Sequence, residues 1–311
     1  MSLSPHPLLI GTRGSPLALW QARHVQGRLI AANGLADDAI ALKVITTSGD
    51  RIHDQPLRDF GGKGLFTKEI DEALIGGAVD LAVHSMKDLP THLPRSITVA
   101  AVLPRADVRD AFVSAKAESL ADLPPGAIVG TSSLRRAAQV RRRRPDLRVV
   151  DFRGNVETRL KKLGEGRADA TLLALAGLER LGLAAHATSI LSTEEMLPAV
   201  AQGAIGVTCR VDDEKTRALL DALNDPASAA AIACERAFLA RLEGSCKTPI
   251  AGLAEIEKGL MRFRGLILTP DGSEWHETER TDVADRAEAI GADAGEALLA
   301  RAGPAFIASL A

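Results

Sequence analysis

The sequence predicts an α/β protein with two similar lobes around a cleft and a small α+β domain at its C-terminal end. Short β-rich runs alternate with helical patterns over the first two thirds of the chain, which is typical of α/β architecture. A strand–turn–helix pattern occurs twice, because Gly11-Thr12 and Gly130-Thr131 each end a strand and lead into a helix. The length of 311 residues allows two or three domains. Chance recurrence is the alternative explanation of the repeat.

The individual elements follow from periodicity and from turn residues. The predicted strands lie at residues 8–11, 42–47, 79–84, 128–130, 147–151, 169–174 and 205–209. The predicted helices lie at residues 17–31, 67–75, 134–143, 156–163 and 228–242. Their alternation predicts parallel sheets, whose carboxyl ends are where ligands bind in open α/β folds.

Three segments are expected as domains. Lobe 1 takes residues 1–103 plus 204–221, since the strand at 205–209 is expected to return to it, and lobe 2 takes residues 109–197. The third domain spans residues 226–311 and begins with a helix that Ser228 caps. It continues with strands near 253–256 and 262–268 and ends in a helical tail.

Positive charge is concentrated in one part of a slightly acidic chain. Residues 130–167 hold 12 Lys and Arg against 4 Asp and Glu, whereas the whole chain has a formal net charge of −2. This asymmetry predicts a specific anionic ligand, and guanidinium groups bind carboxylate or phosphate with two parallel hydrogen bonds. Residues 141–144 are not expected in the site, because four consecutive arginines cover every face of a helix and are expected to be exposed.

Composition excludes several other classes of protein. Aromatic residues make up 3% of the chain, with no Tyr, which argues against single-stranded nucleic acid as a ligand. No apolar run reaches the length of a membrane helix, and the first residues do not resemble an export signal. Three cysteines without a CxxC pair favour a reducing cytoplasm, and scattered histidines predict no metal site.

The segment from His84 to Pro90 places charged residues where an apolar strand stops. Lys87 and Asp88 are expected in extended backbone, so that only one of them faces the cleft, where a carboxylate can hold a cation or move a proton. Taken alone, a Lys-Asp pair is more often a solvated surface pair.

Two further segments are candidates for the site. Asn155 is expected to cap a helix that carries Arg159, with Arg153 just before it. An exposed basic face that binds nucleic acid is the alternative. Cys246 lies in a turn beside Lys247, where a thiol can ionise and act as a nucleophile, whereas Cys209 and Cys234 are expected in the core.

Seven segments in register resemble the porphobilinogen deaminase (hydroxymethylbilane synthase) family between residue 8 and about residue 250. They are Gly11-Thr-Arg-Gly-Ser-Pro-Leu-Ala-Leu-Trp-Gln21, Gly62-Lys-Gly-Leu-Phe-Thr-Lys-Glu69, His84-Ser-Met-Lys-Asp-Leu-Pro90, Gly130-Thr-Ser-Ser-Leu-Arg-Arg136, Arg153-Gly-Asn-Val-Glu-Thr-Arg159, Leu197-Pro-Ala-Val-Ala-Gln-Gly203 and Gly244-Ser-Cys246. Ser245 departs from the pattern, because the family often has a second Gly there.

The resemblance implies two lobes like type II periplasmic binding proteins and a third domain that carries the cofactor cysteine. It implies a cytoplasmic, monomeric transferase with a dipyrromethane cofactor linked to Cys246 by a thioether. Four porphobilinogen molecules are joined head to tail with loss of ammonia, and hydrolysis releases hydroxymethylbilane. No nucleic acid, membrane or metal takes part.

The resemblance also implies roles for individual residues. Asp88 matches the catalytic carboxylate, expected to be buried, and Lys87 lies beside it. The residues that bind the acid side chains of cofactor and substrate are Arg13, Ser15, Thr131, Ser133, Arg135, Arg136, Arg153, Asn155, Arg159 and Arg180. Gln202 lines the site. Phe66 can stack on a pyrrole at the end of a glycine-rich lid that starts at Gly61.

Two other classes compete with this interpretation. The first is a non-catalytic anion-binding protein with the same lobes. This class would account for the arginines, but it would give Cys246 and Asp88 no function. An RNA-binding protein explains the basic stretch, and it predicts binding that weakens steeply with salt.

Overall fold

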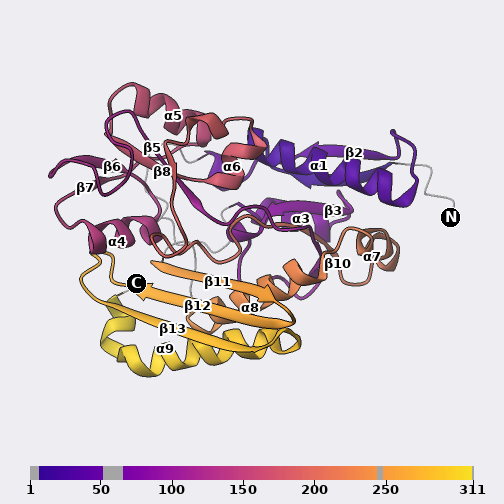
Figure 1. The fold of residues 1–311 in the computed structure, drawn as a ribbon. Helices are drawn as coiled ribbons and strands as arrows, with labels where there is room; N and C mark the ends of the chain where they lie inside the picture. Colours follow the sequence, from indigo (N-terminus) through magenta and orange to yellow (C-terminus); the bar gives the residue numbers. More distant parts are fainter. Residues whose placement is uncertain (1–6, 52–65, 244–247, 310–311) are drawn as a thin grey trace. The chain divides into compact units, whose positions relative to one another are not determined.

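The computed structural model describes residues 7–51, 66–243 and 248–309, and these form two compact units. The first unit contains the described residues up to Arg105 together with Ala204–Ala229. The second contains Ala106–Gly203 and the described residues from Ala230 onward. Three separate sheets lie within these units, one in the first and two in the second (Figure 1). The predicted α/β class, with a small C-terminal α+β part, is confirmed.

The sheet of the first unit has the strand order β2-β1-β3-β10-β4. The strands are β1 (Leu8–Thr12), β2 (Ile40–Val44), β3 (Leu81–Ser85), β4 (Ile97–Val102) and β10 (Ile205–Arg210). Strand β1 is parallel to β2 and β3, whereas β10 is antiparallel to β3 and β4. The helices are α1 (Pro16–Asn33), α2 (Ser48–Arg51), α3 (Lys68–Ile75) and α7 (Glu214–Asp221).

The first core of the second unit repeats this plan with the order β7-β6-β8-β5-β9. The strands are β5 (Asp110–Ser114), β6 (Ile128–Gly130), β7 (Arg148–Val150), β8 (Ala170–Ala174) and β9 (Ser189–Ile190). Strand β6 is parallel to β7 and β8, and β5 is antiparallel to β8 and β9. The helices are α4 (Leu134–Arg143), α5 (Val156–Gly164) and α6 (Leu175–Arg180). Both sheets are therefore mixed, so the predicted parallel arrangement holds for three strands of each sheet and not for the others.

The third sheet is an antiparallel meander of β11 (Ile250–Glu257), β12 (Leu260–Leu268) and β13 (Trp275–Val283). Helices α8 (Pro226–Arg241) and α9 (Ala287–Ser309) accompany it (Figure 1). The two helices touch at Gly291, where an added Cβ would lie 1.9 Å from the carbonyl oxygen of Cys234. Strand β13 replaces part of the predicted helical tail.

The predicted cap of α8 was also wrong, because the helix begins two residues earlier than expected. Pro226 occupies its first turn, where a missing N–H costs nothing, and the Asp225 carboxylate accepts the N–H of Ser228 at 2.8 Å. The Ser228 hydroxyl instead accepts the N–H of Arg105 at 2.9 Å.

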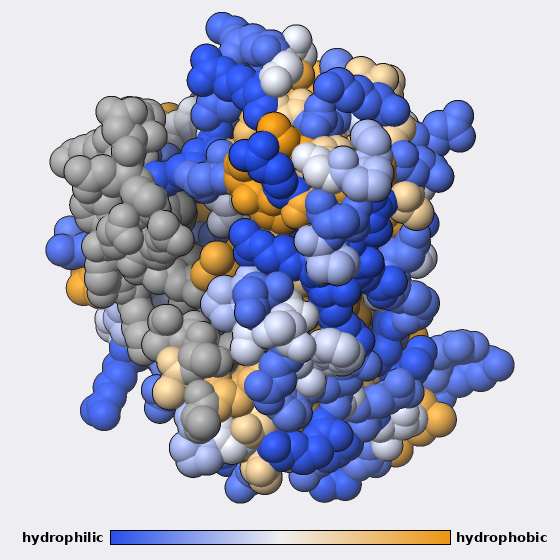
Figure 2. Space-filling view, turned by 90° about the vertical axis from the view of Figure 1, so that its left-hand side faces the viewer, coloured by the Kyte–Doolittle hydropathy of each residue, from blue (hydrophilic) through white to orange (hydrophobic). Residues whose placement is uncertain are grey.

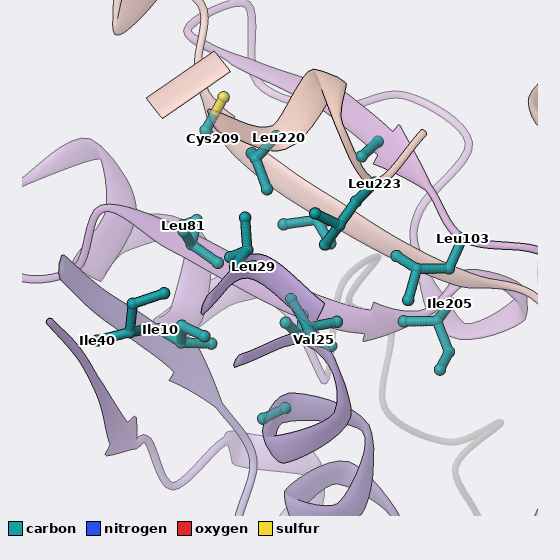
Figure 3. Packing of buried hydrophobic residues seen from close by; sticks show 14 residues of the cluster. Ile10, Val25, Leu29, Ile40, Leu81, Leu103, Ile205, Cys209, Leu220 and Leu223 are labelled. Atoms are coloured by element: carbon teal, nitrogen blue, oxygen red, sulfur yellow. The ribbon is translucent and has the colours of Figure 1, made fainter. Parts of the chain in front are cut away.

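Apolar residues of α1 and of the central strands form the core of the first unit. Figure 3 shows Val25 and Leu29 of α1 packed over Ile10, Leu81 and the strand β10. Cys209 belongs to this core and Cys234 is equally buried, as predicted for both thiols. Burial raises the pKa of Cys234 to about 12, so it stays a neutral thiol.

Hydrophilic residues cover most of the described surface on the face in Figure 2, with small apolar patches between them. Within the described ranges, no helix combines the length and hydropathy that a membrane span requires. The described residues also contain no group of three or more His, Cys, Asp and Glu side chains placed to hold a metal ion.

Candidate functional site

In the first unit, predicted site residues gather where β1 and β3 end. These parallel neighbours place their carboxyl ends at one edge of the sheet, where α/β proteins bind ligands. A pocket of about 70 Å³ lies there. Its lining includes Arg13, Ser15, Phe66 and Asp88. Such a pocket has room for water molecules or for a carboxylate group, because a cavity needs only about 10–15 Å³ to hold one water molecule.

Arg13 is held beside this pocket by two neighbours. Its Nη2 and Nε atoms donate to Asp50 Oδ1 at 2.5 and 3.1 Å, and its guanidinium lies 4.2 Å from the centre of the Phe66 ring. Burial alone would raise the pKa of Asp50, but hydrogen bonds from Arg13 and Thr47 outweigh it and hold that pKa below its ordinary value. Arg13 therefore already binds a carboxylate of its own unit, with Nη2 on Oδ1 and Nε also 3.3 Å from Oδ2.

Ser15, at the same strand end, is the N-cap of helix α1. Its side-chain oxygen accepts the N–H of Ala18 and so caps helix α1. One hydroxyl has two acceptor lone pairs and one donor hydrogen, so the cap leaves the O–H of Ser15 able to donate.

Asp88 follows strand β3 in a short 3₁₀ turn, Met86–Asp88, and not in extended backbone. Lys87 and Asp88 therefore do not point to opposite sides of a strand, which the expected extended backbone would have required. Asp88 is exposed and lines the pocket, which corrects the expectation of a buried carboxylate. Lys87 is half-buried and is not among the residues that line it.

His84 precedes this turn on β3. It is buried, with 6% of its surface exposed, and its Nε2 lies 3.0 Å from the Thr208 hydroxyl on β10. Burial lowers the pKa of His84 to about 4, so the ring is neutral at physiological pH and joins two strands by a hydrogen bond.

The second unit brings Arg135 and Arg136 together on one carboxylate that the sequence analysis missed. Asp110 is fully buried at the start of β5, and its two oxygens accept from Arg135 Nη2 and Arg136 Nη2, both at 2.8 Å. The arginine side chains are only 5% and 6% exposed. Burial would raise the pKa of Asp110, but the two cations outweigh it and hold that pKa far below the ordinary value.

Helix α4 presents these arginines because its first turn is well defined. Ser133 accepts the N–H of Arg136 as the N-cap, and Thr131 accepts the N–H of Ser133 at 3.2 Å. Strand β5 was not predicted, and this is why Asp110 was missed. The apolar run Ala111-Phe112-Val113 after an aspartate was the available signal.

Gln202 completes the cluster around Asp110. Its amide nitrogen donates to Asp110 Oδ1 at 2.8 Å and to the carbonyl of Val108 at 2.7 Å. Arg135 also donates to the carbonyl of Leu197, but its buried Nε–H has no hydrogen-bond partner among the described residues. With two cations against one anion, the cluster retains a net positive charge.

The other arginines of the second unit that were predicted for the site lie around α5 and α6. Asn155 caps α5 as predicted, since it accepts the N–H of Thr158 at 2.8 Å. Arg159 donates to the carbonyl of Gly154 at 2.9 Å. Arg153 precedes the helix and is half-buried, and Arg180 donates to the carbonyl of Gly203 at 2.7 Å. Burial lowers the pKa of Arg180 to about 10, which still leaves it charged at neutral pH.

The run Arg141–Arg144 is only partly a solvated face, because Arg143 is exposed as expected whereas Arg141, Arg142 and Arg144 are half-buried. Arg144 donates to the carbonyls of Leu120 and Leu123 at 2.9 and 2.7 Å. Arg142 pairs with Glu277 on β13 at 2.5 Å and lies over the Trp275 ring. Arg141 reaches the carbonyl of Pro270 at 2.7 Å. These side chains anchor α4 to neighbouring backbone and to the third sheet.

Cys246 and the glycines of the expected lid, Gly61 to Gly64, lie outside the described residues. Among the described residues, each unit holds arginines fit for acid groups, and the first unit adds the exposed carboxylate of Asp88. The orphaned Nε–H of Arg135 and the net positive charge around Asp110 fit a ligand that carries several carboxylates. The dipyrromethane implied above carries such acid side chains.

Comparison with known proteins identifies two matching family models. Residues 8–218 match "Porphobilinogen deaminase, dipyromethane cofactor binding domain", and residues 229–300 match "Porphobilinogen deaminase, C-terminal domain". The porphobilinogen deaminases of Nitrobacter winogradskyi and Paracoccus denitrificans are each 57% identical to the chain over 297 residues. The alignments cover 96% of this chain and 94% and 95% of those proteins. A chloroplastic porphobilinogen deaminase of Pisum sativum is also 57% identical, over 96% of this chain and 83% of its own length.

Proposed function

Because this chain belongs to the porphobilinogen deaminase family, we propose that it joins four porphobilinogen molecules head to tail and releases hydroxymethylbilane. It is a transferase of tetrapyrrole synthesis with a dipyrromethane cofactor binding domain. The observation that best supports the roles below is the pocket at the ends of β1 and β3, where Arg13 and Asp88 line one space. The guanidinium of Arg13 suits the acid side chains of the substrate, and the exposed carboxylate of Asp88 suits the positive charge that the substrate develops.

The cofactor would be bound through its acid side chains and through one covalent bond. Arg135, Arg136 and Arg153 in the second unit and Arg13 in the first are the proposed carboxylate binders, together with Arg159 and Arg180. Ser15, Thr131, Ser133 and Asn155 add hydrogen bonds. When bound through a thioether to Cys246, the dipyrromethane supplies the primer on which the product is assembled.

Asp88 has the electrostatic role in this proposal. Porphobilinogen loses ammonia when its C–N bond breaks, and the methylene carbon left behind is cationic. A carboxylate that accepts the pyrrole N–H stabilises this charge, and it can also take up the proton released later. The exposure of Asp88 leaves its oxygens accessible to substrate. Lys87 and Gln202 are the other proposed site residues, and Phe66 offers a ring face beside Arg13.

The intact mass of the denatured protein tests the covalent part. We expect wild-type protein to carry a bipyrrole adduct, and peptide mapping to place it on Cys246. Cys246→Ala should purify without the adduct and without activity, whereas Cys234→Ala, which alters a buried core thiol, should keep the adduct. Active protein with an unmodified residue 246 would contradict the proposal.

We also propose that the enzyme is a cytoplasmic monomer that does not bind nucleic acid, organised as the three domains 1–103 plus 204–221, 109–197 and 226–311. The bonds of Arg141, Arg142 and Arg144 to their own unit support the absence of nucleic-acid binding. Light scattering should give the mass of a monomer in solution, and cell fractionation should place the protein in the cytoplasm. Limited proteolysis should cut the chain near the proposed domain boundaries. RNA binding that weakens steeply with salt would count against the proposal.

A further inference from the structure

One carboxyl group in the second unit bonds to two separate backbone segments. Glu235 on α8 is 0% exposed. Its Oε2 accepts the N–H of Ala201 at 2.6 Å, and its Oε1 accepts the N–H of Ala254 on β11 at 2.8 Å. The helix that leads toward the cysteine segment is thereby joined to the loop before β10 and to the third sheet.

The first of these bonds falls on a strained residue. Ala201 has a φ of 61°, in the left-handed region that residues with a Cβ rarely adopt. A backbone of this kind persists only where its surroundings hold it, and it is found most often at functional sites. Glu235 holds the N–H of that same residue.

The two residues after Ala201 contact the arginines of the proposed site. Gln202 donates to Asp110, which binds both Arg135 and Arg136. Gly203 accepts a hydrogen bond from Arg180 at 2.7 Å. A change in the Ala201 backbone would therefore move the partners of three acid-binding arginines at once. The backbone of Gly203 packs closely against the preceding segment, because an added Cβ would lie 2.6 Å from the carbonyl oxygen of Ala106.

We propose that Glu235 is a positioning residue, which holds Ala201 in its left-handed conformation and so fixes Gln202 and the arginine cluster for the substrate's carboxylates. It touches neither substrate nor cofactor and acts through the loop. This inference rests on the proposed role of the arginines, but not on the identity of the attachment cysteine.

The principal test compares Glu235→Gln with Glu235→Gln combined with Ala201→Gly. An amide at position 235 has only one acceptor oxygen, so one backbone N–H loses its partner. We expect the KM for porphobilinogen to rise about tenfold with a smaller change in kcat, since one unmet buried hydrogen bond has an effect of that order. Glycine adopts positive φ without strain, so Ala201→Gly should restore most of the KM in the double variant and change little alone.

If Glu235→Gln does not fold, Ala201→Val tests the left-handed conformation of residue 201 with Glu235 left in place. A β-branched residue is strongly disfavoured at positive φ, so the KM should rise as in Glu235→Gln. Asp169→Asn is the matched control in the same unit. Asp169 likewise accepts a backbone N–H, from Ile128 at 2.6 Å, and it should lower stability in urea without changing the KM.

The adduct mass separates this inference from the proposed function. Glu235→Gln should keep the full covalent adduct, because the loop and not the cysteine is disturbed. Loss of the adduct would overturn the positioning role. So would an unchanged KM in Ala201→Val, or a KM that the glycine does not restore. An absent adduct in wild type as well would instead contradict the covalent primer.

Discussion

In the first unit, Arg13 meets Asp50 beside an open pocket with both side chains about one quarter exposed, whereas in the second unit Arg135 and Arg136 share a fully buried Asp110. The residue types are the same, but the surroundings differ. A partly exposed pair exchanges partners more easily, because water screens it and stabilises the separated groups. A buried triad is costly to break, since removing one member leaves charge without compensation. The second unit is thus suited to fixed positioning and the first to a changing ligand.

The largest effect on stability should come from removal of the buried carboxylate. We expect Asp110→Ala to lower the free energy of unfolding by about 3–5 kcal/mol, because two guanidinium groups lose their common anion. Urea unfolding measures this. Arg144→Ala, which removes a more exposed arginine at the C-cap of the helix that carries Arg135 and Arg136, is the control and should cost less. Equal losses in the two variants would show that Asp110 is not a structural centre.

The pH dependence of stability sharpens the same comparison. The pKa of Asp110 is held below the ordinary value of 3.8, so its contribution is fully present above about pH 4 and is lost as the pH falls further. Wild-type protein should therefore destabilise in acid more steeply than Asp110→Ala. Parallel curves for the two proteins would contradict the assignment.

Among the described residues, the largest effect on activity should come from Asp88. Because it is exposed in a short turn, Asp88→Ala should leave the unfolding midpoint unchanged while turnover falls by about 10²–10³ or more. Asp80→Ala, also on the first unit and near the same strand, controls for a general change of charge. Near-normal turnover in the Asp88 variant would remove that residue from its proposed role.

A smaller effect is expected from Asp71, which contrasts with Asp110 as a buried carboxyl whose pKa is raised. Burial and the nearby charge of Glu72 raise the pKa of Asp71 to about 6. The folded state binds this proton more tightly, so this group favours folding increasingly as the pH falls through 6. We expect Asp71→Asn to add about 2 kcal/mol to stability at pH 8 and almost nothing at pH 4. Thermal unfolding at both values tests it, and an advantage independent of pH would refute the titration.

The smallest effect should come from Asp50. Asp50→Asn should cost at most about 1 kcal/mol of stability, because the pair with Arg13 is partly solvated. It should also lower the KM for porphobilinogen a few-fold, since Arg13 no longer has a competing carboxylate. Thr47→Val removes the hydrogen bond from Thr47 to Asp50 and leaves the Arg13–Asp50 pair in place, so it should not lower the KM. A raised KM in Asp50→Asn would show that Asp50 orients Arg13 and does not compete for it.

Local patterns in the sequence predicted much of the first and second sheets. The strand at 128–130 and the helix at 134–143 match the structure at both ends, and Asn155 caps its helix as expected. These features depend on neighbouring residues alone, through periodicity, turn chemistry and one side-chain cap. The same logic failed for Ser228, because Pro226 allows an earlier helix start with Asp225 as its cap.

By itself, the sequence determined the α/β class, the burial of Cys209 and Cys234, and the family to which the chain belongs, because these are written in composition, short-range pattern and motif order. Only the tertiary structure decided that Arg135 and Arg136 share Asp110, that Arg142 reaches Glu277, and that Glu235 holds Ala201. Such pairs join residues 25 to 135 positions apart. These partners are selected because a buried charge or backbone N–H that lacks a partner is costly, and no local pattern in the chain encodes which partner will be near.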